Sequence, residues 1–565
     1  MKYRISNGFI WIALLWIGVF LTSCDPESVI PDTDTPDTSN NNTDGVEEDS
    51  DYIWDTNSET LISFDGNNVN INGNGAITSD AKVTINTPGN YRLKGSWTNG
   101  QLKVKTEGVV RMIFDNVNIT NGSGAPIYVS DAEKVVVILE SDSKNSLVES
   151  FSGTIDSDSI TACFYSKSYL SFAGTGSLDV QTQFKDGIVS KDGLVIKNGR
   201  FSISSEDDGI IGKDYLKIYN GNFEMNTGGD AFASTSESSQ DKGYIQILDG
   251  TYTVTCNGDG FSAETNLTIE GGEFNVISGG GSSKTSSNSA KAFKGKSSIT
   301  VSNGTIQANS ADDGFHSNGS VTIQSGALQL SCATTGIQAA NMITIQEGTL
   351  NISKSKEGME AKFIAINGGN ISIFSSDDSI NATHGSRTES NDGSTIDING
   401  GILTLNAYNG DPLDSNGSIE MNGGTVIIHG PVKSPEVPID YNGTFNISKG
   451  KIIATGPSLQ MAQGLSQSSA QNSIIVKFSS SNTANTLFHI QDANGNDIVT
   501  FRPLRSFALA VFSSELLTQG QNYTIYTGGS ASGNEINGLF LDNNYVPGLS
   551  RKQFTVQSKV TTISI

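Results

Sequence analysis

The amino-acid sequence predicts an all-β fold: a right-handed parallel β-helix with three short strands in each coil of about 22 residues, and a small C-terminal β cap. A motif centred on an Asp-Gly pair recurs along the chain, and six of the nine steps between its copies are 21 or 22 residues. A second motif, which contains a glycine pair or an Asn-Gly pair, keeps the same step. Two signals that share one period are typical of a stacked repeat protein. Aligned on Gly187, the further copies of the first motif are centred on Gly209, Ala231, Gly260, Ala292, Gly314, Gly336, Gly358, Ser379 and Pro412.

Within one coil the apolar residues are spaced as in β-strands. Leu194 and Ile196 are two residues apart, and so are Phe201 and Ile203, which is the side-chain period of a strand. Short strands of this kind can stack in parallel on the coils above and below, and parallel crossovers are nearly always right-handed. We therefore expect one unbroken apolar column in the core, made of Ile188, Ile210, Phe232, Phe261, Phe293, Phe315, Ile337, Met359, Ile380 and Leu413.

Composition limits the classes of partner. The chain has 565 residues with 62 glycines and 17% charged residues, which suits a β structure with many turns. Its formal net charge is -24, so nucleic acid and anionic membrane surfaces would be repelled. Such a charge fits a protein that collects cations, or one that is simply soluble. We expect a monomer.

The first 24 residues predict the compartment. Lys2 and Arg4 precede an apolar run that ends in Leu21-Thr22-Ser23-Cys24. This resembles a bacterial lipoprotein signal, and the resemblance implies that Cys24 is lipidated and anchors the protein at the outer membrane or cell surface. The alternatives are a plain signal peptide or a short membrane anchor, but the run is shorter than the roughly 20 residues that a span needs.

Domain boundaries follow from the pattern. We expect a lipoprotein signal peptide at 1–24, a disordered tether at 25–52, an N-terminal cap with the first coils at 53–160, a regular parallel β-helix at 161–457, and a C-terminal β cap or module at 458–565. The tether is rich in Asp, Thr, Pro and Asn and contains almost nothing to bury. Cys163, Cys256 and Cys332 lie in strand-like stretches and are expected to be buried thiols.

A row of acids stands directly before the aligned glycine, on nearly every coil. Stacked coils lie about 4.8 Å apart, so these carboxylates would be close neighbours of like charge and would call for a cation. Carboxylate and carbonyl oxygens in flexible turns suit Ca²⁺ and not Zn²⁺. The alternative is that Asp-Gly pairs are good turn formers whose carboxylates bond their own backbone N–H groups. The candidate calcium ligands are Asp186, Asp207, Asp208, Asp230, Asp259, Asp312, Asp313, Asp377 and Asp378.

A second row, two residues beyond the aligned glycine, should point outward and becomes polar in the later coils. Donors and acceptors repeated at a step of about 4.8 Å suit an extended polymer lying along the sheet. The alternative is an ordinary solvated face. The candidate ligand-binding residues are Lys294, His316, Gln338, Glu360, Asn381 and Asp414.

The repeated D-G-[IF]-x-[SA] and T-I-x-G-G-x-[FIL], preceded by G-V-V-R-M-I-F-D-N-V-N-I-T-N-G-S-G-A-P-I-Y-V, resemble a bacterial carbohydrate-binding β-helix family of secreted proteins and lipoproteins. The similarity runs from about Trp54 to Gly529. The resemblance implies a right-handed parallel β-helix with bound calcium, a shape related to pectate lyases, and binding of cellulose or polygalacturonate. It also implies that the acidic turns hold calcium, but Lys291 and Thr335 replace the acid in two coils.

The sequence is compatible with three functions. The preferred hypothesis is a surface-anchored, calcium-containing protein that binds plant-type polysaccharide, with no catalytic residue. The first alternative is a calcium-dependent lyase of the pectate type that would use Lys213 or Lys191 as its base. Neighbouring carboxylates would stabilise the charged form of such a lysine, which disfavours this role. The second alternative is a structural or adhesive surface protein.

Overall fold

The computed structural model describes residues 47–151, 160–385, 390–457 and 459–565. Within these residues the protein is all-β with long parallel sheets, apart from two short 3-10 turns, η1 (Asp49–Tyr52) and η2 (Thr56–Ser58). The expected signal peptide, the lipidation of Cys24 and the tether up to residue 46 lie outside the described residues. The described part contains no helix with the length and apolar character to cross a membrane.

The strands form three ladders, in which each strand usually pairs with the strand three further along the chain. We call the chain segment from one strand of a ladder to the next strand of that ladder a lap. Ladder 1 carries the Asp-Gly motif and, after an antiparallel first pair, is parallel throughout the pairings that define it. Its strands are β3 (Ala76–Ser79), β4 (Lys82–Ile85), β6 (Gln101–Lys105), β8 (Ile127–Asp131), β11 (Ala162–Ser166), β14 (Asp186–Ser190), β17 (Ile210–Gly212), β20 (Phe232–Ser234), β23 (Phe261–Ala263), β26 (Phe293–Gly295), β29 (Phe315–Ser317), β32 (Thr335–Ala339), β35 (Glu357–Ala361), β38 (Ile380–Ala382), β41 (Leu413–Ser415) and β44 (Asp440–Tyr441).

Ladder 2 follows ladder 1 within each lap, after a short turn. Its neighbouring strands are parallel, as in β15 on β18 and β18 on β21. The strands are β9 (Lys134–Leu139), β12 (Tyr169–Gly174), β15 (Gly193–Ile196), β18 (Tyr215–Ile218), β21 (Tyr244–Ile247), β24 (Asn266–Ile269), β27 (Ser298–Val301), β30 (Ser320–Ile323), β33 (Met342–Ile345), β36 (Phe363–Ile366), β39 (Thr395–Ile398), β42 (Ser418–Met421) and β45 (Phe445–Ile447).

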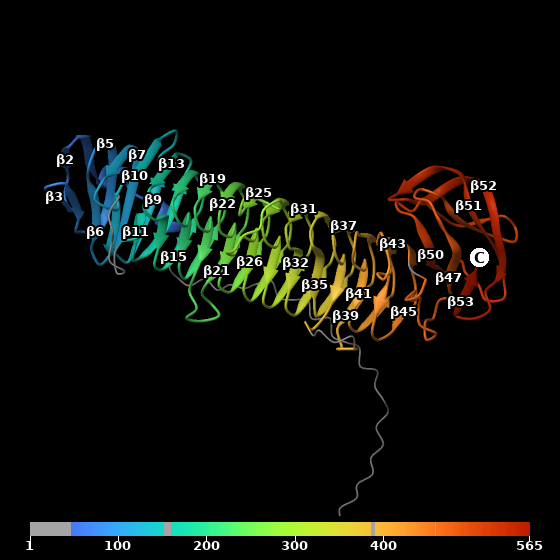
Figure 1. Cartoon of the computed structure of the whole chain (residues 1–565). Coiled ribbons are helices and arrows are strands. Elements are labelled where there is room, and N and C mark those ends of the chain that lie inside the picture. The colour runs from blue at the N-terminus through green and yellow to red at the C-terminus, as the bar shows by residue number, and fades with distance from the viewer. Residues whose placement is uncertain (1–46, 152–159, 386–389, 458) are drawn as a thin grey trace, which may run out of the picture. The chain divides into compact units, whose positions relative to one another are not determined.

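Ladder 3 completes the lap, and Figure 1 shows its strands β19, β22 and β25 following one another. Ladders 2 and 3 both begin from three long early strands, β1 (Glu59–Gly66), β5 (Gly89–Trp97) and β7 (Val109–Asn121), of which β7 pairs with the next strand of each ladder. β2 (Asn68–Asn72) pairs antiparallel with β1. The later strands are β10 (Lys144–Glu149), β13 (Ser177–Thr182), β16 (Arg200–Ser205), β19 (Asn222–Thr227), β22 (Thr251–Cys256), β25 (Glu273–Ser278), β28 (Thr305–Ser310), β31 (Ala327–Cys332), β34 (Thr349–Lys354), β37 (Asn370–Ser375), β40 (Ile402–Ala407), β43 (Thr425–His429) and β46 (Lys451–Gly456).

The glycines of the two repeated motifs have different tasks. A Cβ atom added to Gly187 would lie 2.6 Å from the carbonyl oxygen of Gly209 on the next lap, so the aligned position of this lap has no room for a side chain. The second motif lies in the turn before ladder 3, where Gly272 has a φ of 108° and Gly304 a φ of 123°. Glycine adopts such angles without steric cost, which explains why this turn repeats a glycine at every lap.

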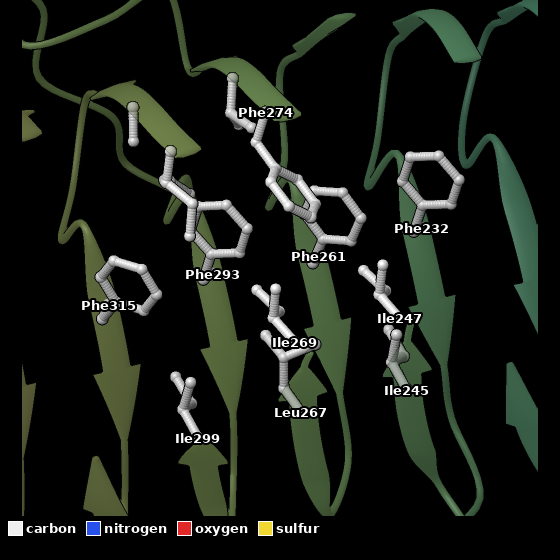
Figure 2. Close-up of a cluster of buried hydrophobic side chains, with 14 of the residues drawn as sticks. Phe232, Ile245, Ile247, Phe261, Leu267, Ile269, Phe274, Phe293, Ile299 and Phe315 are labelled. Carbon is white, nitrogen blue, oxygen red and sulfur yellow. The ribbon is translucent and has the colours of Figure 1, made fainter. Parts of the chain in front are cut away.

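The expected apolar column is confirmed residue by residue. Ile188 pairs with Ile210, which pairs with Phe232, and the column continues in register to Leu413 with every member fully buried. Four of its rings stack on one another, with ring centroids 4.7 to 5.2 Å apart between Phe232 and Phe315 (Figure 2). The same figure shows Ile245, Ile247, Leu267 and Ile269 from ladder 2 beside these rings. The three ladders therefore enclose a single apolar core.

The chain after the last lap continues the sheet with a change of direction. β50 (Phe507–Ser513) pairs antiparallel with β46 and β47 (Ser473–Asn482), and β47 pairs with β53 (Val560–Ser564). A closed four-stranded sheet follows, made of β48 (Phe488–Asp492), β49 (Asp497–Phe501), β52 (Leu539–Thr555) and β51 (Asn522–Ile536). These strands enclose a second hydrophobic cluster, which includes Ile427 of β43 and Ile453 of β46. The core of the ladders is instead continued by Leu465, Ile475, Leu509 and Val511.

The start of the described chain differs from the expected tether, whose last residues, 47–52, pack against ladder 2. The buried ammonium of Lys134 lies 3.0 Å from the buried carboxylate of Asp51. Glu47 forms an ion pair of 2.9 Å with Lys197 and accepts a hydrogen bond of 3.1 Å from the Tyr219 hydroxyl. Residues 47–52 are therefore ordered, because Glu47 and Asp51 find cationic and hydroxyl partners on the sheet.

Candidate functional site

The acids before the aligned glycine stand one above the other along ladder 1. Each carboxylate accepts a hydrogen bond from the backbone N–H at the same position of the next lap. The distance is 2.7 Å from Asp208 Oδ1 to the nitrogen of Asp230, and 2.7 Å from Asp230 Oδ1 to that of Asp259. The N–H groups therefore belong to the next lap and not to the carboxylate's own turn. This acid row comprises Asp186, Asp208, Asp230, Asp259, Asp313, Asp378 and Asp411.

Several carboxylates of the acid row are largely buried and have like-charged neighbours. Burial, reinforced by neighbouring carboxylates, raises the pKa of Asp186 to about 6 and that of Asp230 to about 7. Burial is also the main reason why the pKa of Asp378 rises to about 9 and that of Asp411 to about 8. Each raised pKa means that burial and neighbouring carboxylates destabilise the ionised form more than hydrogen bonds and nearby lysines stabilise it. A cation bound beside these groups would relieve that cost.

Three carboxylates come together at the start of the regular laps. Ligand atoms of Asp186, Asp207 and Asp208 all lie within 4.8 Å of one another, and the described residues contain no other such group of three. Burial is the main cause that raises the pKa of Asp208 to about 6, as it does for Asp186. Several hard oxygen ligands of this kind fit the needs of Ca²⁺.

A lysine that the sequence analysis missed also reaches this cluster. The ammonium of Lys185 lies 3.2 Å from Asp207 Oδ2, and this hydrogen bond is the main cause that raises the lysine's pKa. Both side chains are nearly half exposed. The sequence position of Lys185 could have predicted this contact, because Lys185 directly precedes Asp186 and stands one lap before Asp207. Lys185 is the countercharge that a bound cation would displace from Asp207.

The other predicted calcium ligands have different partners. Asp312 pairs with Lys291, and Asp313 lies 2.8 Å from His316 Nδ1. Asp259 accepts a hydrogen bond of 2.7 Å from the Ser289 hydroxyl and lies 3.2 Å from the Lys294 ammonium. Asp377 lies 3.3 Å from the ammonium of Lys356. The structure gathers none of these acids into a group of three, and their role as ligands stays a prediction.

The predicted outward row lies in register, one residue per lap. Lys294 pairs with His316, His316 with Gln338, and the row continues through Glu360 and Asn381 to Asp414. These side chains are partly exposed, and several contact the acid row. His316 Nδ1 lies 3.0 Å from Gln338 Oε1, and the Asn381 amide donates to Asp378 over 3.4 Å. The two rows together form one polar strip on ladder 1.

The structure does not place the proposed lyase bases at the acid cluster. Lys213 follows Asp208 by five residues with strand β17 between them, which corresponds to roughly 16 Å at about 3.3 Å per residue. The ammonium of Lys191 lies 5.7 Å from the centre of the Tyr165 ring. The lysine that contacts the cluster is Lys185, and its raised pKa opposes the role of a base.

Fold and site define a class: an all-β repeat protein whose polar residues recur at every lap along parallel ladders. The chain belongs to the family described as carbohydrate-binding domain-containing protein, whose sequence model matches residues 79–336 and 326–475.

Two individual proteins are similar to parts of the chain. A carbohydrate-binding domain-containing protein of Acetivibrio thermocellus is 34% identical over 151 residues, which cover 26% of this chain and 52% of that protein. The chain thus spans about half the length of this curated relative. A solved structure, described as a polysaccharide lyase-like protein from C. thermocellum in its gadolinium derivative, is 26% identical, covers 47% of this chain and 96% of that one, and has a TM-score of 0.38.

Proposed function

We propose that this protein binds polysaccharide along ladder 1, with calcium held by Asp186, Asp207 and Asp208. The observation that carries the proposal is the register of the polar strip: each lap repeats an acid, or a polar substitute, and an outward polar side chain. A repeat of about 4.8 Å in donors and acceptors suits a chain-like ligand. Membership of the carbohydrate-binding family supports a polysaccharide as that ligand. In this proposal the three ladders are the faces of a right-handed parallel β-helix.

The acidic cluster gives this proposal its chemistry. A calcium ion supplies positive charge and open coordination positions, through which an acidic protein can hold the carboxylate of a uronic acid. Asp186 would present buried oxygens and Asp208 half-buried ones, and the ion would replace Lys185 as the partner of Asp207. The ligand would be a plant-type polysaccharide, cellulose or a polygalacturonate-like polymer. Lys294, His316, Gln338, Glu360, Asn381 and Asp414 would contact it along the strip.

We also propose that the protein is anchored at the cell surface through a lipid on Cys24. The described chain begins against ladder 2, where Glu47 contacts Lys197 and Tyr219. Ladder 1 carries none of these contacts. An anchor that reaches the body at Glu47 is therefore compatible with a polymer on ladder 1.

The test is retention of the purified protein on insoluble polygalacturonate and cellulose, with calcium and with a chelator. We expect retention on polygalacturonate that requires calcium and is lost in Asp207→Asn combined with Asp208→Asn. Asp65→Asn, which changes an exposed carboxylate outside the acid row, should bind like the wild type. Absence of retention on both polymers would contradict the proposal. Release of an unsaturated product, measured by ultraviolet absorbance, would instead establish a lyase.

A further inference from the structure

The outer face of ladder 3 is a second polar surface, and it differs from ladder 1 in charge. We call the outward residues of β22, β25, β28, β31, β34 and β37 the amide face. Their alternation is regular, with apolar side chains inward and polar ones mostly exposed. The middle column of this face runs in register through Thr253, Asn275, Gln307, Gln329, Asn351 and Ser372.

The amide face is almost free of charge. Its outward positions carry one acid, Glu273, and one base, Lys354, although the formal net charge of the chain is -24. The middle column contains neither acid nor base. Ladder 1, by contrast, presents a carboxylate on nearly every lap. The amide face therefore suits an uncharged ligand that needs no bridging cation. An ionic ligand would find few groups of opposite charge there.

The amides of the middle column have no hydrogen-bond partner among the described residues, although register neighbours such as Gln307 and Gln329 stand side by side. Amides elsewhere in the same stack bond one another across laps. In the turn before ladder 3 the Asn367 amide donates to Gln346 over 2.8 Å, and that of Asn399 donates to Asn367 over 2.8 Å. The amides in the turn thus hydrogen-bond one another. The amides of the middle column can donate hydrogen bonds to a ligand and accept hydrogen bonds from it.

Two features border the middle column. Beyond one edge, the loop after β25 brings Ser282 to Asn309, whose side-chain oxygen lies 2.7 Å from the Ser282 nitrogen, and to Ser331 at 2.8 Å. Along the other edge, a hollow is lined by the turn glycines Gly272, Gly304 and Gly326 together with Glu273 and Thr305. The column therefore runs between a loop wall and a shallow hollow.

Aromatic rings stand at the far end of the same face. Phe374, an outward residue of β37, is 42% exposed. Tyr408, which follows β40, is 46% exposed, and the Arg505 guanidinium lies 5.5 Å from the centre of its ring. Most large apolar side chains of the ladders are buried, so two exposed rings at one place are unusual in this fold. Flat apolar rings beside free amides can contact both the apolar and the hydroxyl-bearing sides of a sugar.

We propose that the amide face binds an extended, uncharged polysaccharide, separately from the strip on ladder 1. The inference rests on the proposed function and assigns its two classes of polymer to two surfaces. An acidic polymer would bind ladder 1 with calcium, and a neutral polymer would bind ladder 3 without calcium. Asn275, Gln307, Gln329 and Asn351 bond the hydroxyl groups, and Phe374 contacts a sugar ring.

The test compares Gln307→Ala combined with Gln329→Ala, and Phe374→Ala, with the wild type on two kinds of probe. The neutral probes are cellulose, galactomannan and xyloglucan, and the acidic probe is polygalacturonate with calcium. We expect the affinity for at least one neutral polymer to fall at least tenfold in both variants, with retention on polygalacturonate unchanged. Asp207→Asn combined with Asp208→Asn should show the reverse pattern. These face residues are exposed, so a matched urea midpoint serves as the folding control.

The outcomes separate this inference from the proposal on which it rests. If the wild type binds no neutral polymer but binds polygalacturonate, the amide-face inference is wrong and the proposed function stands. Neutral binding that survives in both variants would also overturn the inference. If the protein binds neither kind of polymer, both proposals fail. Neutral binding that requires calcium would place the neutral polymer on ladder 1.

Discussion

Asp230 and Asp259 are 29 residues apart in sequence, yet the carboxylate of the first accepts a hydrogen bond from the backbone N–H of the second over 2.7 Å. This contact joins successive laps outside the strand pairing. It explains why an acid stands at this position even where no ion is needed. It also sets carboxylates of like charge one lap apart, which raises the pKa of Asp230 in addition to the larger effect of burial.

Replacing Asp230 separates these two effects. We expect Asp230→Ala to lower the free energy of unfolding by about 1–3 kcal/mol, because the N–H of Asp259 loses its acceptor in a buried place. Asp230→Asn keeps an acceptor oxygen and removes a charge, so it should be more stable than the alanine variant. Urea denaturation in a chelator measures both. Equal stability of Asp230→Ala and the wild type would show that the hydrogen bond contributes nothing.

Calcium should stabilise the folded protein through the carboxylate cluster. At a concentration of about 100 times the dissociation constant, one bound ion adds about 2.7 kcal/mol to the free energy of unfolding. We expect this gain to be lost in Asp207→Asn, whose side chain is 47% exposed and whose replacement leaves the core intact. Titration calorimetry and thermal unfolding with added calcium measure it. The same gain in Asp207→Asn and in Asp65→Asn would place the ion elsewhere.

The buried ion pair of Asp51 and Lys134 should hold the first described residues on ladder 2. The side chains are 4% and 7% exposed, and removal of one partner from a buried pair typically costs about 3–5 kcal/mol. We expect Asp51→Ala to detach residues 47–54, whose Tyr52 and Trp54 pack on ladder 2. Limited proteolysis should then cleave this segment early. The exposed Asp49→Ala is the matched control, and equal protection in both variants would contradict the prediction.

His429 should make the junction with the C-terminal module sensitive to acid. Its Nε2–H donates to the carbonyl of Asn537 over 3.0 Å, and its Nδ1 accepts from the N–H of Leu504. Burial, with a further effect of the Arg505 guanidinium, lowers the histidine's pKa from 6.5 to about 4. Between pH 6.5 and pH 4 the unfolded chain therefore binds a proton that the folded chain does not, and stability falls as the pH falls.

Comparison of the wild type with His429→Gln isolates this group, because the carboxylates whose pKa is raised are common to both proteins. We expect the wild type to lose about 2 kcal/mol relative to the variant between pH 7.5 and pH 5. Urea denaturation at the two pH values measures the difference. A difference that is independent of pH would mean that His429 has the same pKa in the folded and the unfolded protein.

Much of the fold could be predicted because the length of the repeat fixes which residues pair on neighbouring strands. A step of 21 or 22 residues brings Ile188, Ile210 and Phe232 to equal positions of successive laps, and all three are buried as expected. The alternation that predicted this column also applies to ladder 3. The free amides of Asn275 and Gln307 were therefore visible as exposed strand positions, but the acids of ladder 1 were the stronger signal.

The sequence by itself determined the all-β class, the stacked laps and the apolar column, since all three depend only on the period and on side-chain alternation. The tertiary structure decided which polar groups act together. The period places Asp207, Asp312 and Asp377 at equivalent positions, and each pairs with a lysine of the preceding lap, which is Lys185, Lys291 or Lys356. Side-chain reach and burial differ from lap to lap, and for that reason three carboxylates come together, among the described residues, at Asp186, Asp207 and Asp208 and not at the equivalent acids of later laps.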